Sequence, residues 1–222
     1  MRSTHVFVAA SAAVVSFGQI ASADLYTDPV GDQGPSNGNL DIVEVGMSND
    51  DSNLRIDIRT NEFADWTKYL VFLDYRDGGA TGNNNPWFRN VEMGDNGIDA
   101  FAGVWVDGGG GMQLFTDEGG SWSGADGGSV DDASGTGNTV SLLFSLEALG
   151  IGFGDVIKFD IGTSGGNNGD PATDLISVGS TAASWGGQAT AGELRSYTVV
   201  PAPGTLALLG VAGGLAMRRR RA

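Results

Sequence analysis

The sequence predicts an all-β fold, an antiparallel β-sandwich of jelly-roll type, on the basis of two observations. Short apolar segments recur along the chain, and clusters of glycine, asparagine and aspartate separate them. The central region lacks the long 3.6-residue periodicity of helices. Many short strands bounded by turns are typical of sandwiches. The 37 glycines could instead indicate disorder, but the aromatic and β-branched content of the strands favours a packed core.

The individual strands follow from local periodicity. Residues 54–59 and 157–161 alternate apolar with polar or charged side chains, which predicts strands with one face in water. Residues 69–73 are continuously apolar and predict a central strand. Further strands are predicted at 42–47, 87–93, 101–106, 112–115, 140–145, 175–178 and 196–200, and a helical turn at 146–149. The segments 49–53, 77–79, 107–111 and 165–170 are rich in residues that tolerate positive φ and predict turns.

The N-terminus has the pattern of a secretory signal peptide. Arg2 and His5 give a weakly basic start, residues 6–15 are almost wholly apolar, and residues 21–23 read Ala-Ser-Ala. Small residues at this spacing are the cleavage pattern of exported proteins. We therefore predict a signal peptide at 1–23, with Asp24 as the first mature residue.

The C-terminus predicts a short membrane anchor. Two prolines mark a hinge, residues 204–217 carry no charge, and four arginines follow. As a helix the uncharged run reaches about 21 Å, short of the roughly 30 Å hydrocarbon core, so the span is marginal. The arginines resist translocation and should remain cytoplasmic, which places the rest of the chain outside. A frayed C-terminal helix on a globular domain is the alternative.

This tail resembles the PEP-CTERM sorting signal of Gram-negative bacteria. The matching residues are Pro201, Pro203, Arg218, Arg219, Arg220 and Arg221. Ala202 stands where that signal usually has glutamate. The resemblance implies that an exosortase recognises the tail, that the helix anchors the chain transiently in the inner membrane, and that removal near Pro201 delivers the protein to the cell envelope or the extracellular space.

Three regions are therefore expected: the signal peptide at 1–23, one β-sandwich domain at 24–198 and the sorting tail at 199–222. All 27 acidic residues lie in the domain, against seven basic ones, so its net charge is −20. Such a surface repels nucleic acid and favours solubility or cations. The chain has no cysteine, so its core must suffice without a disulfide.

The mature chain lacks the residues of most catalytic sites. The single histidine, His5, leaves with the signal peptide, and there is no cysteine. Nucleophilic triads, histidine-ligated zinc and a histidine-ligated haem are thereby excluded, and no nucleotide cofactor is expected. We predict a protein that is not an enzyme. The alternative is a carboxylate-dependent glycan-active enzyme using a pair such as Glu44 and Glu92, which lie in predicted strands; otherwise both side chains point into water.

The body resembles the β-sandwich modules related to family 9 carbohydrate-binding modules and DOMON domains. The residues that carry the resemblance are the opening segment 28–32, Leu-Asp-Ile at 40–42, the hairpin at 49–53, and the closing segments 140–150, 155–163 and 170–174. The resemblance implies binding of sugar or another small ligand, sometimes with structural calcium, and no chemistry.

Acidic loops supply candidate calcium ligands, because calcium takes six to eight hard oxygens and flexible loops with Asp and Asn can provide them. Three clusters qualify: Asp28 with Asp32, Asp95 with Asn96 and Asp99, and Asp170 with Asp174. None has the spacing of an EF-hand. Alternatively, each cluster is a turn whose side chain caps its own backbone. We expect at least one calcium ion to stabilise the fold.

Five tryptophans offer flat surfaces for sugar binding. Trp87 and Trp122 lie beside Gly/Asn-rich loops and are predicted to be the exposed, ligand-binding pair, whereas Trp105 is predicted to be core. Alternatively, all five pack in or under the sandwich. Together these patterns predict an exported, non-catalytic surface or extracellular-matrix protein whose sandwich binds extracellular polysaccharide or another small ligand.

Overall fold

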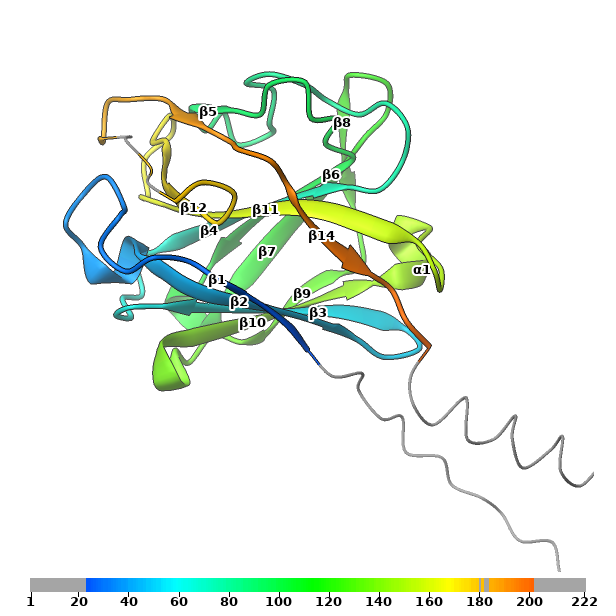
Figure 1. Cartoon of the computed structure of the whole chain (residues 1–222), viewed down its shortest axis with the longest axis horizontal. Coiled ribbons are helices and arrows are strands. Elements are labelled where there is room, and N and C mark those ends of the chain that lie inside the picture. The colour runs from blue at the N-terminus through cyan, green and yellow to red at the C-terminus, as the bar shows by residue number, and fades with distance from the viewer. Residues whose placement is uncertain (1–22, 180, 182–183, 202–222) are drawn as a thin grey trace, which may run out of the picture.

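The computed structural model describes residues 23–179, 181 and 184–201. The predicted signal peptide, except Ala23, and the predicted transmembrane helix lie outside these residues. Within the described ranges, no helix combines the length and apolar character needed to span a bilayer. The described chain is mostly β-structure arranged in antiparallel sheets (Figure 1).

One sheet has five strands in the order β1-β2-β3-β10-β9. Its members are β1 (Asp24–Thr27), β2 (Ile42–Asn49), β3 (Asn53–Thr60), β10 (Thr139–Ser145) and β9 (Gly128–Asp132). Every neighbouring pair in this sheet is antiparallel. It lies in the lower half of Figure 1.

The second sheet has seven strands, six of them in the order β12-β11-β4-β6-β7-β8, while β14 also pairs with β11. Its members are β12 (Ala172–Leu175), β11 (Val156–Ser164), β4 (Lys68–Asp74), β6 (Ala100–Trp105), β7 (Gly111–Asp117), β8 (Trp122–Ala125) and β14 (Arg195–Thr198). A parallel pair, β5 (Val91–Glu92) with β13 (Ala189–Thr190), lies apart. The helical elements are α1 (Leu146–Leu149), η1 (Gly38–Leu40), η2 (Asp107–Gly109) and η3 (Thr136–Asn138).

The main core combines side chains from both large sheets. Alternate residues of β3, namely Leu54, Ile56 and Ile58, are fully buried in it, as the period of two predicts. A second apolar cluster contains Leu70 and Phe72, together with residues of β5, β6, β12 and β13. Strand β4 therefore contributes to both clusters, which explains its unbroken apolar run and confirms the prediction of a central strand.

Most predicted strands are confirmed, and two are wrong in extent. The predicted strand at 87–93 is reduced to Val91–Glu92, because the side chain of Asn85 hydrogen-bonds both the N–H and the carbonyl of Arg89 and closes a loop there. The strand predicted at 175–178 instead spans Ala172–Leu175 and ends in a turn. The short strands β1, β8, β9 and β13 were not predicted. The helical turn at 146–149 is confirmed as α1.

The two ends of the described chain lie at the same end of the molecule (Figure 1). The hydroxyl of Tyr26 in β1 donates a hydrogen bond to the carbonyl of Ser196 in β14, at 2.6 Å. Val199 is fully buried in the main core. The folded domain thus extends past the predicted boundary at residue 198, because Val199 contributes apolar surface to the core.

Candidate functional site

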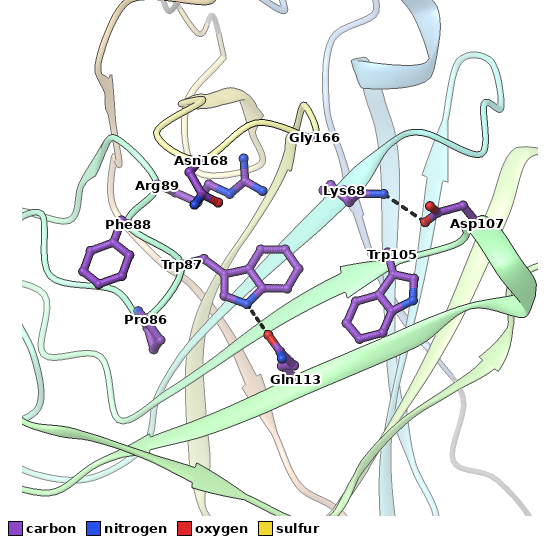
Figure 2. A pocket seen from close by; sticks show the side chains of 10 residues that line it. All are labelled: Lys68, Pro86, Trp87, Phe88, Arg89, Trp105, Asp107, Gln113, Gly166 and Asn168. Carbon is purple, nitrogen blue, oxygen red and sulfur yellow. Dashed lines mark hydrogen bonds and ion pairs between the residues drawn. The ribbon is translucent and has the colours of Figure 1, made fainter.

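A pocket of about 430 Å³ opens on the larger sheet beside the loop that carries Trp87 (Figure 2). Strands β4, β6 and β7 supply Lys68, Trp105 and Gln113, while η2 supplies Asp107 and two loops, at 86–89 and 166–168, supply the remaining residues. The full lining is Lys68, Pro86, Trp87, Phe88, Arg89, Trp105, Asp107, Gln113, Gly166 and Asn168. Phe88 lies at one edge of the pocket and Asp107 near the opposite edge (Figure 2).

Two indole rings form the aromatic part of this pocket. The rings of Trp87 and Trp105 are stacked, with centroids 6.4 Å apart and planes inclined by 26°. Gly103 makes room for the first ring, because a Cβ there would lie 2.1 Å from Trp87 Cε2. Gly111 does the same for Trp105, whose Cζ2 would lie 2.2 Å from such a Cβ. Both glycines lie in strands, so the rings rest directly on the sheet.

The loop before β5 presents Phe88 in an unusual conformation. Phe88 has a φ of +54°, which is a strained value for a bulky residue. Its side chain is nevertheless 80% exposed, so burial of the ring does not stabilise this conformation. The Asn85 side chain closes the loop around it through two hydrogen bonds to Arg89, of 2.8 and 2.9 Å. The fold therefore holds an aromatic ring out into solvent at the pocket rim.

Arg89 connects this loop to the neighbouring segment 164–167. Its Nη1 donates to Ser164 Oγ, to the Gly165 carbonyl and to the Asn167 carbonyl at 3.3, 3.1 and 2.6 Å. The guanidinium also lies 5.3 Å from the centre of the Trp87 ring, a favourable cation–π distance. Burial lowers the pKa of Arg89 from its ordinary value. Arg89 therefore fastens the loop that carries Trp87 to the segment 164–167 at the side of the pocket.

Polar groups in the pocket are set by two further contacts. Trp87 Nε1 donates to Gln113 Oε1 at 2.8 Å, which fixes the indole and leaves the amide N–H groups of Gln113 available. Lys68 Nζ lies 2.9 Å from Asp107 Oδ1. The hydrogen bond from Lys68 is the main cause of a lowered pKa at Asp107, so this carboxylate is ionised at neutral pH.

The structure pairs the tryptophans differently from the sequence expectation. Trp87 lines the pocket, but its stacking partner is Trp105, which is half-buried and not fully in the core. Trp122 packs edge-on against Phe101 and donates to Asn84 Oδ1 at 3.2 Å, outside the pocket lining. The hairpin at 107–110 was a usable signal, because its register places Gly111 opposite Trp105. No sequence signal marked Phe88.

A second aromatic pair, Trp66 with Trp185, lies near the loop at 165–166. Trp66 and Trp185 are 39% and 44% exposed, with ring centroids 6.3 Å apart. A Cβ on Gly165 would lie 2.7 Å from Trp185 Cζ3, and the next residue, Gly166, lines the pocket. The segment 165–166 therefore borders both the pocket that holds the first pair and Trp185 of the second pair.

Of the predicted acidic clusters, the structure brings Asp28 and Asp32 together with Asp174. One carboxylate oxygen of each lies within 4.8 Å of the others. Burial, followed by the charges of Asp174 and Asp32, raises the pKa of Asp28 to about 8. Burial also raises the pKa of Asp32 and brings that of Asp174 to about 7. These shifts indicate like charges gathered in a poorly solvated place.

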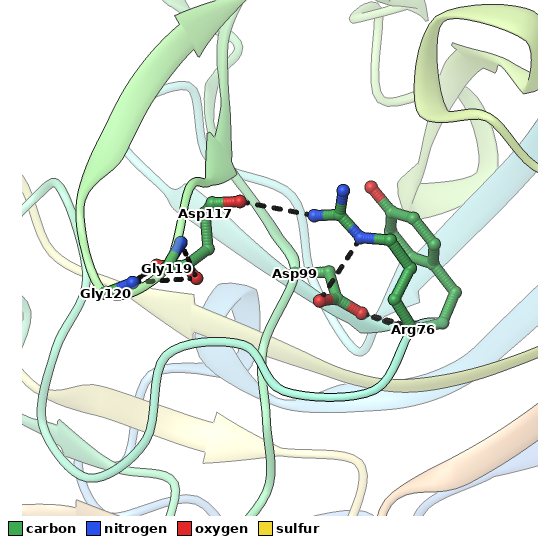
Figure 3. Close-up of polar contacts among 6 residues, drawn as sticks. Arg76, Asp99, Asp117, Gly119 and Gly120 are labelled. Carbon is green, nitrogen blue, oxygen red and sulfur yellow. Dashed lines mark hydrogen bonds and ion pairs between the residues drawn. The ribbon is translucent and has the colours of Figure 1, made fainter.

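The other predicted ligands have different roles. Asp99 accepts hydrogen bonds from the N–H groups of Tyr75 and Arg76, both at 2.7 Å, and its Oδ1 lies 3.4 Å from Arg76 Nε (Figure 3). Asp95 is exposed on a loop. Asp170 accepts from the N–H of Asn167 at 2.9 Å and caps its own turn. These contacts match the alternative in which an acidic side chain caps a nearby backbone group.

The glutamates considered for catalysis lie on different sheets. Glu44 is in β2 and lies 3.6 Å from Arg59 Nε, whereas Glu92 is in β5 and accepts from the N–H of Gly94. Neither lines the aromatic pocket, whose lining includes one carboxylate, that of Asp107.

Comparisons with known proteins give no match: no protein-family model, no curated protein and no solved structure corresponds to this chain.

Proposed function

We propose that this chain is an exported, non-catalytic surface or extracellular-matrix protein whose β-sandwich binds carbohydrate chains in the aromatic pocket. The observation that carries the proposal is the stacked pair of Trp87 and Trp105 in an open pocket with polar groups beside it. Flat aromatic rings supply apolar contact area at little entropic cost, and a few placed polar groups give orientation. A sugar ring requires both, because it has C–H faces and hydroxyl edges.

The exposed ring of Phe88 strengthens this interpretation. Strained backbone conformations cluster at functional sites, and burial of the ring does not account for the strain at Phe88. Lys68, Gln113 and Asn168 supply hydrogen-bonding groups along the same pocket. The volume of about 430 Å³ falls in the range of small-ligand pockets.

The second pair, Trp66 with Trp185, favours an extended ligand. The segment 165–166 borders both pairs, because Gly166 lines the pocket that holds Trp87 and Trp105, and Gly165 lies against Trp185. A polysaccharide chain that crosses this segment can stack one unit on each pair. A single sugar would use the pocket alone.

The acid content of the pocket favours binding over hydrolysis. Carboxylate-pair glycosidases need two carboxyl groups across the scissile bond, one with a raised pKa. Asp107 is the one carboxylate among the lining residues, and the hydrogen bond from Lys68 lowers its pKa. The carboxylate-dependent enzyme therefore has less support than the binding protein.

The proposed localisation of the protein rests on the two ends of its sequence. A signal peptide ending at Ala23 agrees with a folded domain whose first strand, β1, begins at Asp24. The tail from Pro201 onward supplies the proline motif, the apolar run and the arginines of an exosortase substrate. In a Gram-negative host we expect a secreted form that begins at Asp24 and lacks residues 204–222. N-terminal sequencing and intact mass measure both ends of this form. A full-length cytoplasmic product would contradict the proposed export.

Affinity electrophoresis against a panel of soluble polysaccharides tests the binding function. Retardation by at least one polysaccharide is expected, and Trp87→Ala with Trp105→Ala should abolish it. Trp122→Ala is the matched control, since it removes an indole outside the pocket. Retardation lost with Trp122→Ala but kept in the double variant would overturn the assignment of the site. Release of reducing sugar that is abolished by Glu44→Gln or Glu92→Gln would favour the enzyme.

A further inference from the structure

We propose that Asp28, Asp32 and Asp174 form a calcium site, with the side-chain oxygen of Gln33 as a further ligand, and that the ion joins the two sheets. None of these residues lines the aromatic pocket. The inference is therefore independent of carbohydrate binding.

The three carboxylates converge from distant parts of the chain. Asp28 and Asp32 lie in the loop that follows β1, in the five-stranded sheet, whereas Asp174 lies in β12 at an edge of the larger sheet. One carboxylate oxygen of each residue lies within 4.8 Å of the other two. Two oxygens bound to one calcium ion at 2.3–2.6 Å are separated by no more than about 5 Å, so this spacing suits a shared ion.

The second observation is a set of buried oxygens without hydrogen-bond partners. Asp28 is only 8% exposed, and neither of its carboxylate oxygens has a partner among the described residues. The same holds for both oxygens of Asp32 and for Gln33 Oε1. Buried polar atoms in folded proteins are almost always satisfied, and buried carboxylates are paired or bind metal. Together Asp28 and the adjacent residues Asp32 and Gln33 present five buried oxygens that a bound cation would satisfy.

The surrounding charges do not supply that cation. Asp41 lies close enough to act on Asp32 and Asp174, and Asp160 acts on Asp28, so further negative charge faces the cluster. Arg195 is the basic group that acts on Asp28, but its Nε donates to the Ile176 carbonyl at 3.1 Å. Among the described residues, none of the ion pairs includes Asp28, Asp32 or Asp174.

Neighbouring hydrogen bonds hold the ligands in place. Asp41 accepts from the N–H of Gly31 through both oxygens, at 3.0 and 3.1 Å, which shapes the loop between Asp28 and Asp32. Asp174 Oδ2 accepts from the N–H of Ile42 at 2.7 Å, and this contact already spans the two sheets. The Gly34 N–H donates to the Thr173 carbonyl at 2.9 Å and docks the loop on β12. Such supporting contacts are typical of metal sites.

The donor set selects the kind of ion. All candidate ligands are carboxylate or amide oxygens, and the mature chain has no histidine or cysteine to favour zinc or copper. Asp28 and Asp32 can each offer two oxygens, and Asp174 and Gln33 one each, which reaches the six to eight that calcium takes. Magnesium prefers fewer protein ligands with retained water. The dissociation constant expected for an extracellular calcium module is about 10⁻⁴–10⁻³ M.

The test uses the purified protein after chelation and dialysis. Isothermal titration calorimetry with CaCl₂ should show one binding site. In a thermal melt, 5 mM CaCl₂ should raise the melting temperature by several degrees, whereas 5 mM MgCl₂ should raise it less. An unchanged melting temperature with no calorimetric signal would overturn the proposal, and so would equal stabilisation by both ions.

Charge-removing variants separate a metal site from a merely structural cluster. Asp28→Asn combined with Asp32→Asn should lose the calcium-induced rise in melting temperature, yet melt at a higher temperature than the wild type in EDTA, because the repulsion is gone. Asp95→Asn, which changes an exposed loop acid, is the matched control and should respond to calcium like the wild type. A double variant that retains the full calcium response would overturn the assignment of these ligands.

Discussion

The side-chain amide of Asn49 hydrogen-bonds both backbone groups of Val200: its Oδ1 accepts from the N–H at 3.1 Å, and its Nδ2 donates to the carbonyl at 2.8 Å. The same Oδ1 accepts from the hydroxyl of Tyr197 at 2.7 Å. Asn49 is fully buried at the end of β2. It therefore fixes the chain immediately before the proline motif at residue 201.

Asn49→Ala should destabilise the fold, because it leaves the Val200 backbone and the Tyr197 hydroxyl without their partner. We expect a loss of about 2–4 kcal/mol in the free energy of unfolding, measured by urea denaturation. Tyr197→Phe removes one of these bonds and should cost about 1 kcal/mol. Equal costs for the two variants would show that Asn49 does not clamp the chain end.

Gly103→Ala should displace the Trp87 ring, since the added Cβ would lie 2.1 Å from it. We expect a loss of polysaccharide retardation and a destabilisation of about 1–3 kcal/mol from overpacking. Gly124→Ala is the matched control, because this strand glycine in β8 has nothing within 4 Å of such a Cβ. Its stability should stay within about 0.5 kcal/mol of the wild type. Normal binding by Gly103→Ala would contradict the described packing.

Phe88→Gly should stabilise the protein and weaken carbohydrate binding at the same time. Glycine adopts a φ of +54° without strain, and the exposed ring contributes little packing. The strain relieved is about 1–3 kcal/mol, partly offset by about 0.5–1 kcal/mol for the greater freedom of glycine in the unfolded chain. Urea denaturation and affinity electrophoresis measure the two effects separately. A less stable variant would mean that the ring has a packing role.

Asp99→Ala should destabilise the protein to the same extent in calcium and in EDTA. Asp99 is 2% exposed, and the variant leaves the N–H groups of Tyr75 and Arg76 without their acceptor (Figure 3). The expected cost is about 2–4 kcal/mol in the free energy of unfolding, measured with and without 1 mM EDTA. A cost that appears in calcium alone would restore Asp99 as a metal ligand.

Asp160→Asn should flatten the decline of stability with pH. Burial raises the pKa of Asp160 to about 7, although Ser177 and Arg195 favour its charged form. The unfolded carboxyl titrates near 3.9, so the folded state binds its proton more tightly, and the contribution of Asp160 to stability falls as pH rises from about 4 to about 7.

Asparagine can keep the contacts of Asp160 to Ser177 and Ile161 without ionising. The difference in unfolding free energy between variant and wild type should therefore grow by roughly 4 kcal/mol at most from pH 4 to pH 8, measured at constant calcium. Asp95→Asn, at an exposed loop position, is the control. A constant difference across this range would mean that Asp160 is ionised throughout.

Local sequence pattern was sufficient for the regular strands and insufficient for the site loops. Strand β3 follows from alternation because one of its faces is buried. Alternation also predicts the strand at 157–161, but the expectation of one face in water is wrong there, because both faces of β11 are buried from Phe159 onward and Asp160 is fully buried. The strand predicted at 87–93 is wrong over 87–90, because the Asn85 side chain competes for the backbone hydrogen bonds of Arg89. Short edge strands such as β8 and β9 carry too few apolar residues to be recognised.

The sequence by itself determined the β-rich fold, the surplus of acidic residues, the lack of cysteine and the presence of a single histidine, at residue 5. Tertiary structure decided which of these residues meet. Trp87 stacks on Trp105 because glycines in two strands leave room for both rings. Asp174 joins Asp28 and Asp32 because β12 packs across from the loop after β1. Such contacts depend on strand order and register, which bring together residues that are far apart in the chain and that no local pattern links.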